Sequence, residues 1–247
     1  GGTAAGSGLN AHPQYREEMV KQLSEQTNLD LKPTKNTFET MQSMAPFVEV
    51  SGALRSLAID MTRIANDLRL LASGPRTGFA EIELPPVQPG SSIMPGKVNP
   101  VLAEMLNMVC YHVIGNDTTV AMAAQAGQLE LNVMMPVIAH DLLEALTVFR
   151  NALDAFAEKC VRGITADEER CGEYAEKSLS LITALNPHVG YARAAEIAKE
   201  MLRSKRGARE VTRELGLMDD EKLDRVLDLR SMTGPPIYTG EGQLKES

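Results

Sequence analysis

Residues 46–72, PFVEVSGALRSLAIDMTRIANDLRLLA, decide the fold of this chain. Their apolar side chains recur at steps of three and four, at Phe47, Val50, Leu54, Leu57, Met61, Ile64, Leu68 and Leu71. This spacing places the apolar residues on one face and predicts a long amphipathic helix over residues 46–72. Ser73-Gly74-Pro75 follows and is expected to end the helix. Such a helix must cover its apolar face with other helices.

Two further long helices are predicted after residue 100. The first is apolar from Val101 to Ile114, and we expect it to break at Gly115-Asn116-Asp117 before it resumes to Gly127. The second covers residues 128–158, with Pro136 as an expected kink. Helices of this length, apolar over much of their circumference, need partners on several sides. We therefore expect a helix bundle that is shared between subunits.

After Gly163 the predicted helices become shorter and more charged. They are expected over residues 167–181, 187–204 with Asn186 as cap, 209–215 and 219–229. Few stretches alternate with period two, and none alternates with helices as βαβ units would, so the predicted fold class is all-α. The predicted domains are a long-helix bundle over residues 1–163, a small C-terminal helical domain over 164–229 and a mobile tail over 230–247.

Composition and charge exclude several classes of protein. With 247 residues, 43% hydrophobic and 23% charged, the chain is globular rather than disordered. A formal charge of −8 and only 4% aromatic residues disfavour binding to nucleic acid. No apolar run approaches the roughly 18 residues of a membrane span, and no secretion signal is present, so we expect a cytoplasmic protein without a membrane partner.

Cysteine and histidine positions do not suggest a metal site. The three cysteines form no C-x-x-C pair, and the four histidines are scattered; they are Cys110, Cys160, Cys171, His12, His112, His140 and His188. Zinc sites usually have closely spaced ligands of these types. We therefore expect no metal and no other cofactor.

A loop of unusual composition, GSSIMPGKVNP at residues 90–100, precedes the second long helix. Its prolines and glycines disfavour a helix and favour tight turns. Asn99 and Pro100 have the residue types of an N-cap and a first helical position. Because a helix start carries unpaired N–H groups and Lys97 adds a positive charge, a carboxylate or phosphate is expected to bind there. The hydroxyl groups of Ser91 and Ser92 would lie beside that anion.

The loop and five further segments resemble the aspartase/fumarase superfamily of lyases. The further segments are residues 66–76, 81–82, 115–117, 130–133 and 185–191, in the same order as in the family. The resemblance implies a homotetramer whose active sites are shared between subunits, with a central long-helix domain and a small C-terminal domain. Two family signature regions, one carrying a catalytic histidine, would precede Gly1, so the chain resembles a C-terminal portion of such an enzyme.

The resemblance also implies a reaction, the reversible β-elimination of a small group from a dicarboxylate substrate to give fumarate. The intermediate would be an aci-carboxylate, whose extra negative charge requires cationic and N–H donors. Position by position, Ser91 would be the general base, Glu104 would pair with the histidine upstream of Gly1, and Ser92, Lys97, Val98 and Asn99 would contact the substrate. A serine hydroxyl can act as a base only where N–H groups and positive charge stabilise its alkoxide.

The leaving group remains open at the level of sequence. Residues 113–120 and 126–134 look more like aspartases, which favours release of ammonia from L-aspartate. Asn186-Pro187-His188 is shared with fumarases, which release water from L-malate. A third alternative is a catalytically silent helical scaffold of the same superfamily, and the presence of Ser91 and Lys97 argues against it.

Overall fold

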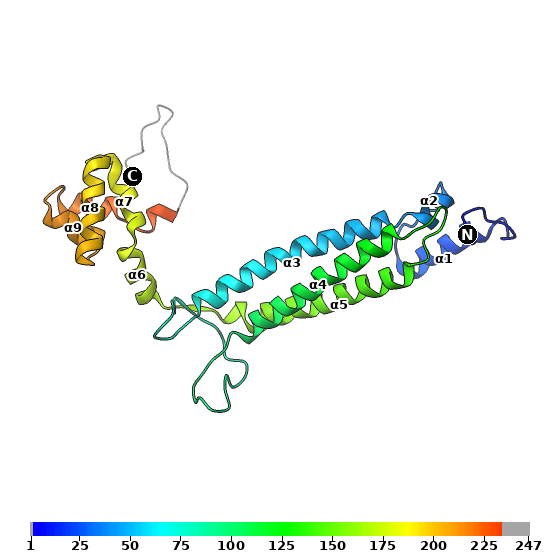
Figure 1. Cartoon of the computed structure of the whole chain (residues 1–247), viewed down its shortest axis with the longest axis horizontal. Helices are drawn as coiled ribbons and strands as arrows, with labels where there is room; N and C mark the ends of the chain where they lie inside the picture. Colours follow the sequence, from blue (N-terminus) through cyan, green and yellow to red (C-terminus); the bar gives the residue numbers. More distant parts are fainter. Residues whose placement is uncertain (1, 234–247) are drawn as a thin grey trace. The chain divides into compact units, whose positions relative to one another are not determined.

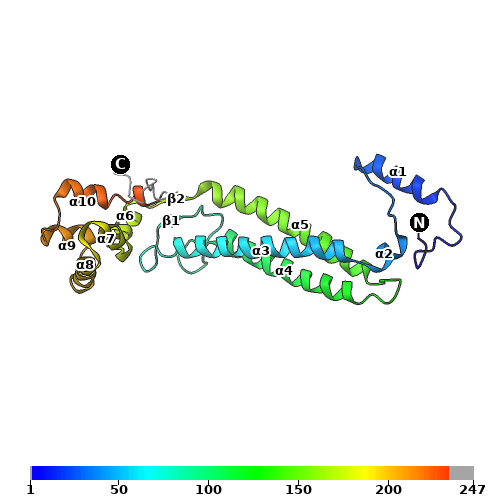
Figure 2. The same cartoon turned by 90° about the horizontal axis from the view of Figure 1, so that it is seen from above.

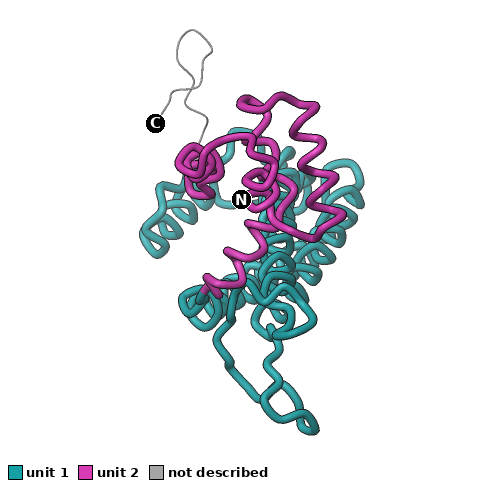
Figure 3. Tube along the Cα trace, turned by 90° about the vertical axis from the view of Figure 1, so that its left-hand side faces the viewer, with its two compact units in different colours: residues 1–165 teal, residues 166–247 magenta. Residues whose placement is uncertain are grey.

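The structure is a computed structural model that describes residues 2–233. It contains two compact units, residues 1–165 and 166–247, which Figure 3 shows in different colours. The predicted all-α fold class is confirmed, because strand in residues 2–233 is limited to β1 (Ile82–Glu83) and β2 (Thr165–Ala166), which pair as a two-stranded sheet. Residues 234–247 of the predicted tail lie outside the described residues, and Ser231–Thr233 form the short 3-10 helix η3.

Unit 1 is built on three long helices. They are α3 (Ala45–Leu71), α4 (Val101–Gln125) and α5 (Met135–Lys159), and they are accompanied by α1 (Tyr15–Thr27), α2 (Thr37–Gln42) and the 3-10 helix η1 (Val161–Gly163). Figures 1 and 2 show α3, α4 and α5 side by side, with consecutive helices running in opposite directions. No helix in residues 2–233 is long and apolar enough to cross a membrane.

The core of unit 1 combines small residues on α3 with larger ones on α4 and α5. Its buried members are Ala58, Ala65, Ala103, Leu106, Cys110, Val113, Ala145, Phe149, Ala152, Phe156 and Cys160. Alanines at the contact allow two helix backbones to approach closely. Burial raises the pKa of the Cys110 and Cys160 thiols, as expected for cysteines that act as small apolar residues.

The predicted break at residues 115–117 is wrong, because α4 continues through them to Gln125. Asp117 is only 4% exposed, and its two carboxylate oxygens accept hydrogen bonds from Ser51 Oγ and Arg55 Nη1 of α3, both at 2.7 Å. These partners satisfy a buried charge inside the helix and offset the low helix propensity of Gly115. The contact with α3 therefore keeps residues 115–117 helical, although their residue types favour a break.

Pro136 lies in the first turn of α5 and does not kink the helix. The helix starts at Met135, so Pro136 occupies its first turn, where the N–H that proline lacks would have no partner within the helix. Residues 128–134, which were predicted to be helical, form a connection in which Gln128 and Leu131 make an isolated bridge. Asn132 is fully buried there, and its Nδ2 donates to the carbonyl oxygens of Ala123 and Ala124 at 3.0 Å each.

Unit 2 packs short helices around its own apolar core. The helices are α6 (Glu168–Lys177), α7 (Ile182–Val189), α8 (Tyr191–Ser204), α9 (Ala208–Glu214) and α10 (Asp220–Val226), together with the 3-10 helix η2 (Leu179–Leu181). Leu185, Ile197, Val211, Leu223 and Leu227 are each fully buried in this core.

The predicted cap at Asn186 is wrong. Pro187 lies inside α7, and α8 begins only after Gly190, whose φ of +80° is a conformation that favours glycine. The carbonyl of Asn186 accepts a hydrogen bond from the Gly190 N–H at 3.0 Å, so Asn186 belongs to the end of α7. His188 consequently lies in the last turn of α7 and not at a helix start.

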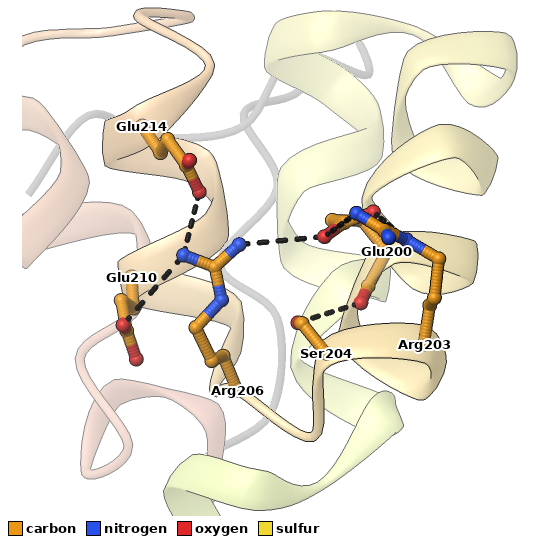
Figure 4. A network of polar contacts seen from close by, with 6 residues as sticks. All are labelled: Glu200, Arg203, Ser204, Arg206, Glu210 and Glu214. Atoms are coloured by element: carbon orange, nitrogen blue, oxygen red, sulfur yellow. Dashed lines mark hydrogen bonds and ion pairs between the residues drawn. The ribbon is translucent and has the colours of Figure 1, made fainter.

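A network of ion pairs joins α8 to α9 in unit 2 (Figure 4). The guanidinium of Arg206 lies 2.6 Å from Glu214 Oε2, 3.7 Å from Glu210 Oε1 and 3.3 Å from Glu200 Oε1. Arg203 donates two further hydrogen bonds to Glu200, at 2.8 and 2.9 Å. The Arg203 hydrogen bond is the largest cause that lowers the pKa of the Glu200 carboxyl, and Glu214 raises the pKa of Arg206. The charges of this region are thus satisfied within unit 2.

Candidate functional site

The loop at residues 90–100 leads directly into α4 and is closed at its base by two hydrogen bonds. The N–H of Gly90 donates to the carbonyl oxygen of Lys97 at 3.0 Å, and Asn99 Nδ2 donates to the carbonyl oxygen of Gly90 at 2.7 Å. A Cβ atom at residue 90 would lie 2.1 Å from the Lys97 carbonyl oxygen. Only glycine allows this approach, so Gly90 determines the shape of the loop.

Ser91 lies at the start of the closed loop, and its hydroxyl oxygen faces backbone donors. The Oγ atom accepts hydrogen bonds from the N–H groups of Ile93 at 3.2 Å and Met94 at 3.1 Å. Serine often makes such local bonds in turns, and they hold its side chain in one position. Two amide dipoles directed at one oxygen also stabilise negative charge on it. The arrangement therefore places two N–H donors where they would face a negative charge on this oxygen.

Three of the predicted site residues, Ser91, Lys97 and Val98, line one hollow of about 580 Å³. Its other lining residues are Pro86, Val87, Gln88, Pro89, Gly90, Met94, Pro95 and Gly96. The Lys97 side chain is exposed, and within residues 2–233 it forms no ion pair. An uncompensated ammonium near a hydroxyl oxygen is suited to binding a carboxylate.

Ser92 and Asn99 do not line this hollow. Ser92 is exposed on the loop, and the side chain of Asn99 holds the base of the loop closed. The prediction that Asn99 caps the helix is wrong: α4 begins at Val101 with Pro100 at the cap position and no side-chain cap bond. The amide of Asn99 is directed at Gly90 instead, because that bond joins the two ends of the loop.

Glu104 lies in the first turn of α4 and has a cationic neighbour that the sequence analysis missed. Its Oε1 is 3.9 Å from Nη2 of Arg69 on α3, and both side chains are about 40% exposed. Arg69 Nη1 donates to Asn66 Oδ1 at 3.4 Å, and the same oxygen accepts from Nδ2 of buried Asn107 at 2.7 Å. Arg69 falls in the segment 66–76 that resembles the family, which is the signal that could have identified it.

A second polar cluster lies between α4 and α5. It contains His112 and His140, two of the histidines that the sequence analysis described as scattered. One ligand atom each from His140, Asp141 and Glu144 lie within 4.8 Å of one another. Glu144 Oε2 is also 3.1 Å from His112 Nε2 and 3.3 Å from Asn116 Nδ2. His140, Asp141 and Glu144 lie on α5, whereas His112 and Asn116 lie on α4, so the packing of α4 on α5 brings the two groups together.

Comparison with known proteins connects these features to one family. Residues 1–115 match the family described as Lyase, and residues 181–234 match the family described as Fumarase C C-terminus. An aspartate ammonia-lyase of Helicobacter pylori is 47% identical over 238 residues, which cover 96% of this chain and 51% of that protein.

Two solved structures are similar over 95% of the chain. A structure described as fumarate lyase:delta crystallin from Brucella melitensis bound to cobalt has a TM-score of 0.90 at 51% identity, over 51% of its length. A class II fumarase from Schistosoma mansoni has a TM-score of 0.87 at 38% identity, over 53% of its length. The chain therefore spans about half the length of the relatives it matches. From the loop, the helical fold and these matches together, this chain belongs to the aspartase/fumarase superfamily of lyases.

Proposed function

We propose that the full-length protein catalyses the reversible elimination of ammonia from L-aspartate to give fumarate. The observation that carries this proposal is the similarity to aspartate ammonia-lyases of Helicobacter pylori and Bacillus subtilis, at 47% and 46% identity over 96% of the chain. The preference for aspartate also agrees with the aspartase-like segments at residues 113–120 and 126–134.

In the proposed mechanism, Ser91 removes the proton from the carbon next to a substrate carboxylate. The N–H groups of Ile93 and Met94 support this role, because they would stabilise the alkoxide that a serine base requires. Loss of the proton places an additional negative charge on the substrate carboxylate, as an aci-carboxylate. The exposed ammonium of Lys97, on the same hollow as Ser91, is suited to bind that charge. Ammonia then leaves from the neighbouring carbon, and the double bond of fumarate forms.

Ser92, Val98 and Asn99 complete the proposed set of residues that contact the substrate or shape its loop. Glu104 would orient the family's histidine, which belongs to a region upstream of Gly1. Ile93, Met94 and Val98 expose 89%, 57% and 53% of their surface. Exposed apolar side chains beside a candidate base favour a loop that closes over the substrate and excludes water.

The proposed assembly is a homotetramer with active sites shared between subunits, located in the cytoplasm. Support for the assembly comes from large apolar side chains on the exposed faces of α3, among them Phe47, Val50, Leu57 and Ile64. Such side chains along one helix are typical of a surface that another subunit covers. The cytoplasmic location rests on the sequence alone.

A fumarate hydratase is the second candidate. It is favoured by the match of residues 181–234 to the Fumarase C C-terminus and by the likeness to the class II fumarase. Both reactions use the same carboxylate chemistry at Ser91 and Lys97, and they differ in the leaving group. Residues upstream of Gly1 would contribute most of the contacts to that group.

An activity assay of the full-length protein distinguishes the candidates. We expect fumarate, followed by its ultraviolet absorbance, to form from L-aspartate with stoichiometric release of ammonia, and much more slowly from L-malate. A preference for L-malate would identify a fumarate hydratase and would leave the proposed role of Ser91 intact. Absence of turnover with either substrate, in a protein that folds and assembles, would instead support the silent scaffold.

A further inference from the structure

The polar cluster between α4 and α5 contains three side chains with the atoms that bind divalent transition metals. His140, Asp141 and Glu144 lie on consecutive turns of α5, where Glu144 follows Asp141 by three residues and His140 by four and is a surface neighbour of each. One ligand atom from each lies within 4.8 Å of the other two. One imidazole nitrogen and two carboxylate oxygens form a ligand set that suits Zn²⁺ and its neighbours in the first transition series.

The distances fit an ion with little rearrangement. Zinc lies about 2.0–2.2 Å from nitrogen and oxygen ligands, so in a tetrahedral site those ligands are about 3.4 Å apart. The three ligand atoms begin within 4.8 Å, and His140 is exposed and can rotate about its side-chain torsions. One coordination position would remain for water.

Residues of α4 hold one of the ligands in place. His112 Nε2 lies 3.1 Å from Glu144 Oε2, and Asn116 Nδ2 donates to the same oxygen at 3.3 Å. Asn116 also donates to the backbone carbonyl of Asp141 at 3.3 Å. Groups of this kind orient ligands in known metal sites.

The cluster also lacks an internal cation. Within residues 2–233, no lysine or arginine forms an ion pair with Asp141 or Glu144, and His112 is the partner of Glu144. Two carboxylates held close together repel each other, and a divalent cation removes that repulsion.

We propose that His140, Asp141 and Glu144 bind one divalent transition-metal ion, with His112 and Asn116 as the residues that orient Glu144. The imidazole ligand makes the site selective for Zn²⁺ over Mg²⁺, which prefers oxygen ligands in an octahedral arrangement. The bound ion cross-links two consecutive turns of α5 and, through Glu144, connects α5 to α4. Its effect is therefore on the stability of unit 1, independent of the chemistry at Ser91.

Calorimetric titration of the full-length, tag-free protein with Zn²⁺ tests the proposal. We expect one tight site per chain that His140→Ala and Glu144→Gln each weaken by at least tenfold, and that His112→Ala weakens by about 10–100-fold. Mg²⁺ should bind at least tenfold more weakly than Zn²⁺. At one Zn²⁺ concentration, the rise in Tm should be larger for the wild-type protein than for His140→Ala, because the stabilisation grows with the ratio of free metal to Kd. All three replaced side chains are partly or fully exposed, so helicity by circular dichroism is expected to stay the same.

His188→Ala is the matched control, because His188 is also an exposed histidine on a helix but lies in unit 2. It should bind Zn²⁺ as the wild-type protein does. The proposal is overturned if the wild-type protein has no tight Zn²⁺ site, or if His140→Ala and Glu144→Gln bind Zn²⁺ as tightly as the wild type. Equal affinity for Mg²⁺ would also overturn it, since a simple acidic surface behaves in that way.

Discussion

The two units of this chain bury their apolar residues in opposite ways. In unit 2, the short helices α7 to α10 surround a core whose central residues, such as Leu185, Ile197 and Leu223, are fully buried. In unit 1, the 27-residue helix α3 buries only Ser51, Ala58 and Ala65, and it exposes large apolar side chains over the rest of its length. Each unit has a core of its own, and unit 1 in addition exposes large apolar side chains along α3.

Arg206 in unit 2 and Lys97 in unit 1 are cations with different surroundings. In unit 2, Arg206 lies among Glu200, Glu210 and Glu214, so cation and anions are matched locally. In unit 1, the Lys97 ammonium forms no ion pair in the part of the chain that the structure describes. In the proposed function, the exposed apolar side chains of α3 would contact another subunit and the Lys97 ammonium would contact the substrate.

Replacement of Ser91 is expected to have the largest effect. In the full-length protein, Ser91→Ala should lower kcat by about 10²–10⁴-fold, because proton transfer loses its base. Helicity and assembly should not change, since the side chain bonds only to its own loop. The matched control is Ser180→Ala, an exposed serine of unit 2, which should retain full turnover. Near-normal turnover of Ser91→Ala would place the chemistry outside this loop.

A charge on the exposed face of α3 should disrupt assembly. Leu57 is 45% exposed in the single chain, and Leu57→Glu would bury a carboxylate in the proposed subunit contact at a cost of several kcal/mol. Leu215 of unit 2 is similarly exposed, at 49%, and Leu215→Glu should be tolerated. Light scattering should report a tetramer for the wild type and Leu215→Glu, and smaller species for Leu57→Glu. A wild-type monomer, or equal masses for both variants, would contradict the proposal that α3 forms a subunit contact.

Removal of a core side chain should destabilise unit 2 alone. Leu223 is fully buried, so Leu223→Ala should lower the free energy of unfolding of unit 2 by about 2–5 kcal/mol. Urea titration followed by hydrogen exchange of individual amides would measure this change separately in the two units. Mass and turnover at low temperature should stay near wild type. An equal loss of protection in α3–α5 would show that the units do not unfold separately.

The smallest predicted effect concerns acid stability. The pKa of Glu200 is lowered in the folded state, mainly by the hydrogen bond from Arg203. A carboxyl with a lowered folded-state pKa contributes stability above its unfolded value, near 4.5, and that stability is lost as the pH falls through the folded value. Arg203→Met should therefore lower the Tm at neutral pH and flatten the decline of Tm below pH 4.5. Arg16→Met, on exposed α1, should leave the acid profile as steep as in the wild type.

Local sequence patterns predicted the long helices but not all of their ends. The three-and-four spacing predicted a helix over residues 46–72, and α3 spans Ala45–Leu71. The pattern failed at Gly115 to Asp117, because what keeps α4 helical there is a contact with residues more than sixty positions away. It failed again at Asn99 and Asn186, whose cap-like residue types bond elsewhere. Patterns within a short stretch of sequence do not show which bonds a residue makes elsewhere in the fold.

The same limit applies to the candidate site. The composition of residues 90–100 indicated an ordered loop with an anion site, and the structure adds that Ser91, Lys97 and Val98 line one hollow. The neighbour of Glu104, Arg69, could not be inferred from spacing because it comes from another helix. Likewise, His112 and Glu144 meet only through the packing of α4 on α5.

The buried carboxylate of Asp117 also determines how α3 and α4 align along their length. The buried apolar residues of α3 in this core are Ala58 and Ala65, whose small side chains by themselves would do little to hold one helix in place along the other. Sliding α3 by four residues would bring Phe47 and Ser51, or Arg55 and Ile59, to the positions of Ser51 and Arg55. Either shift leaves a desolvated charge with half of its partners. The two hydrogen bonds to Asp117 thus favour one alignment of the two helices. The same bonds set where α4 begins relative to the end of α3.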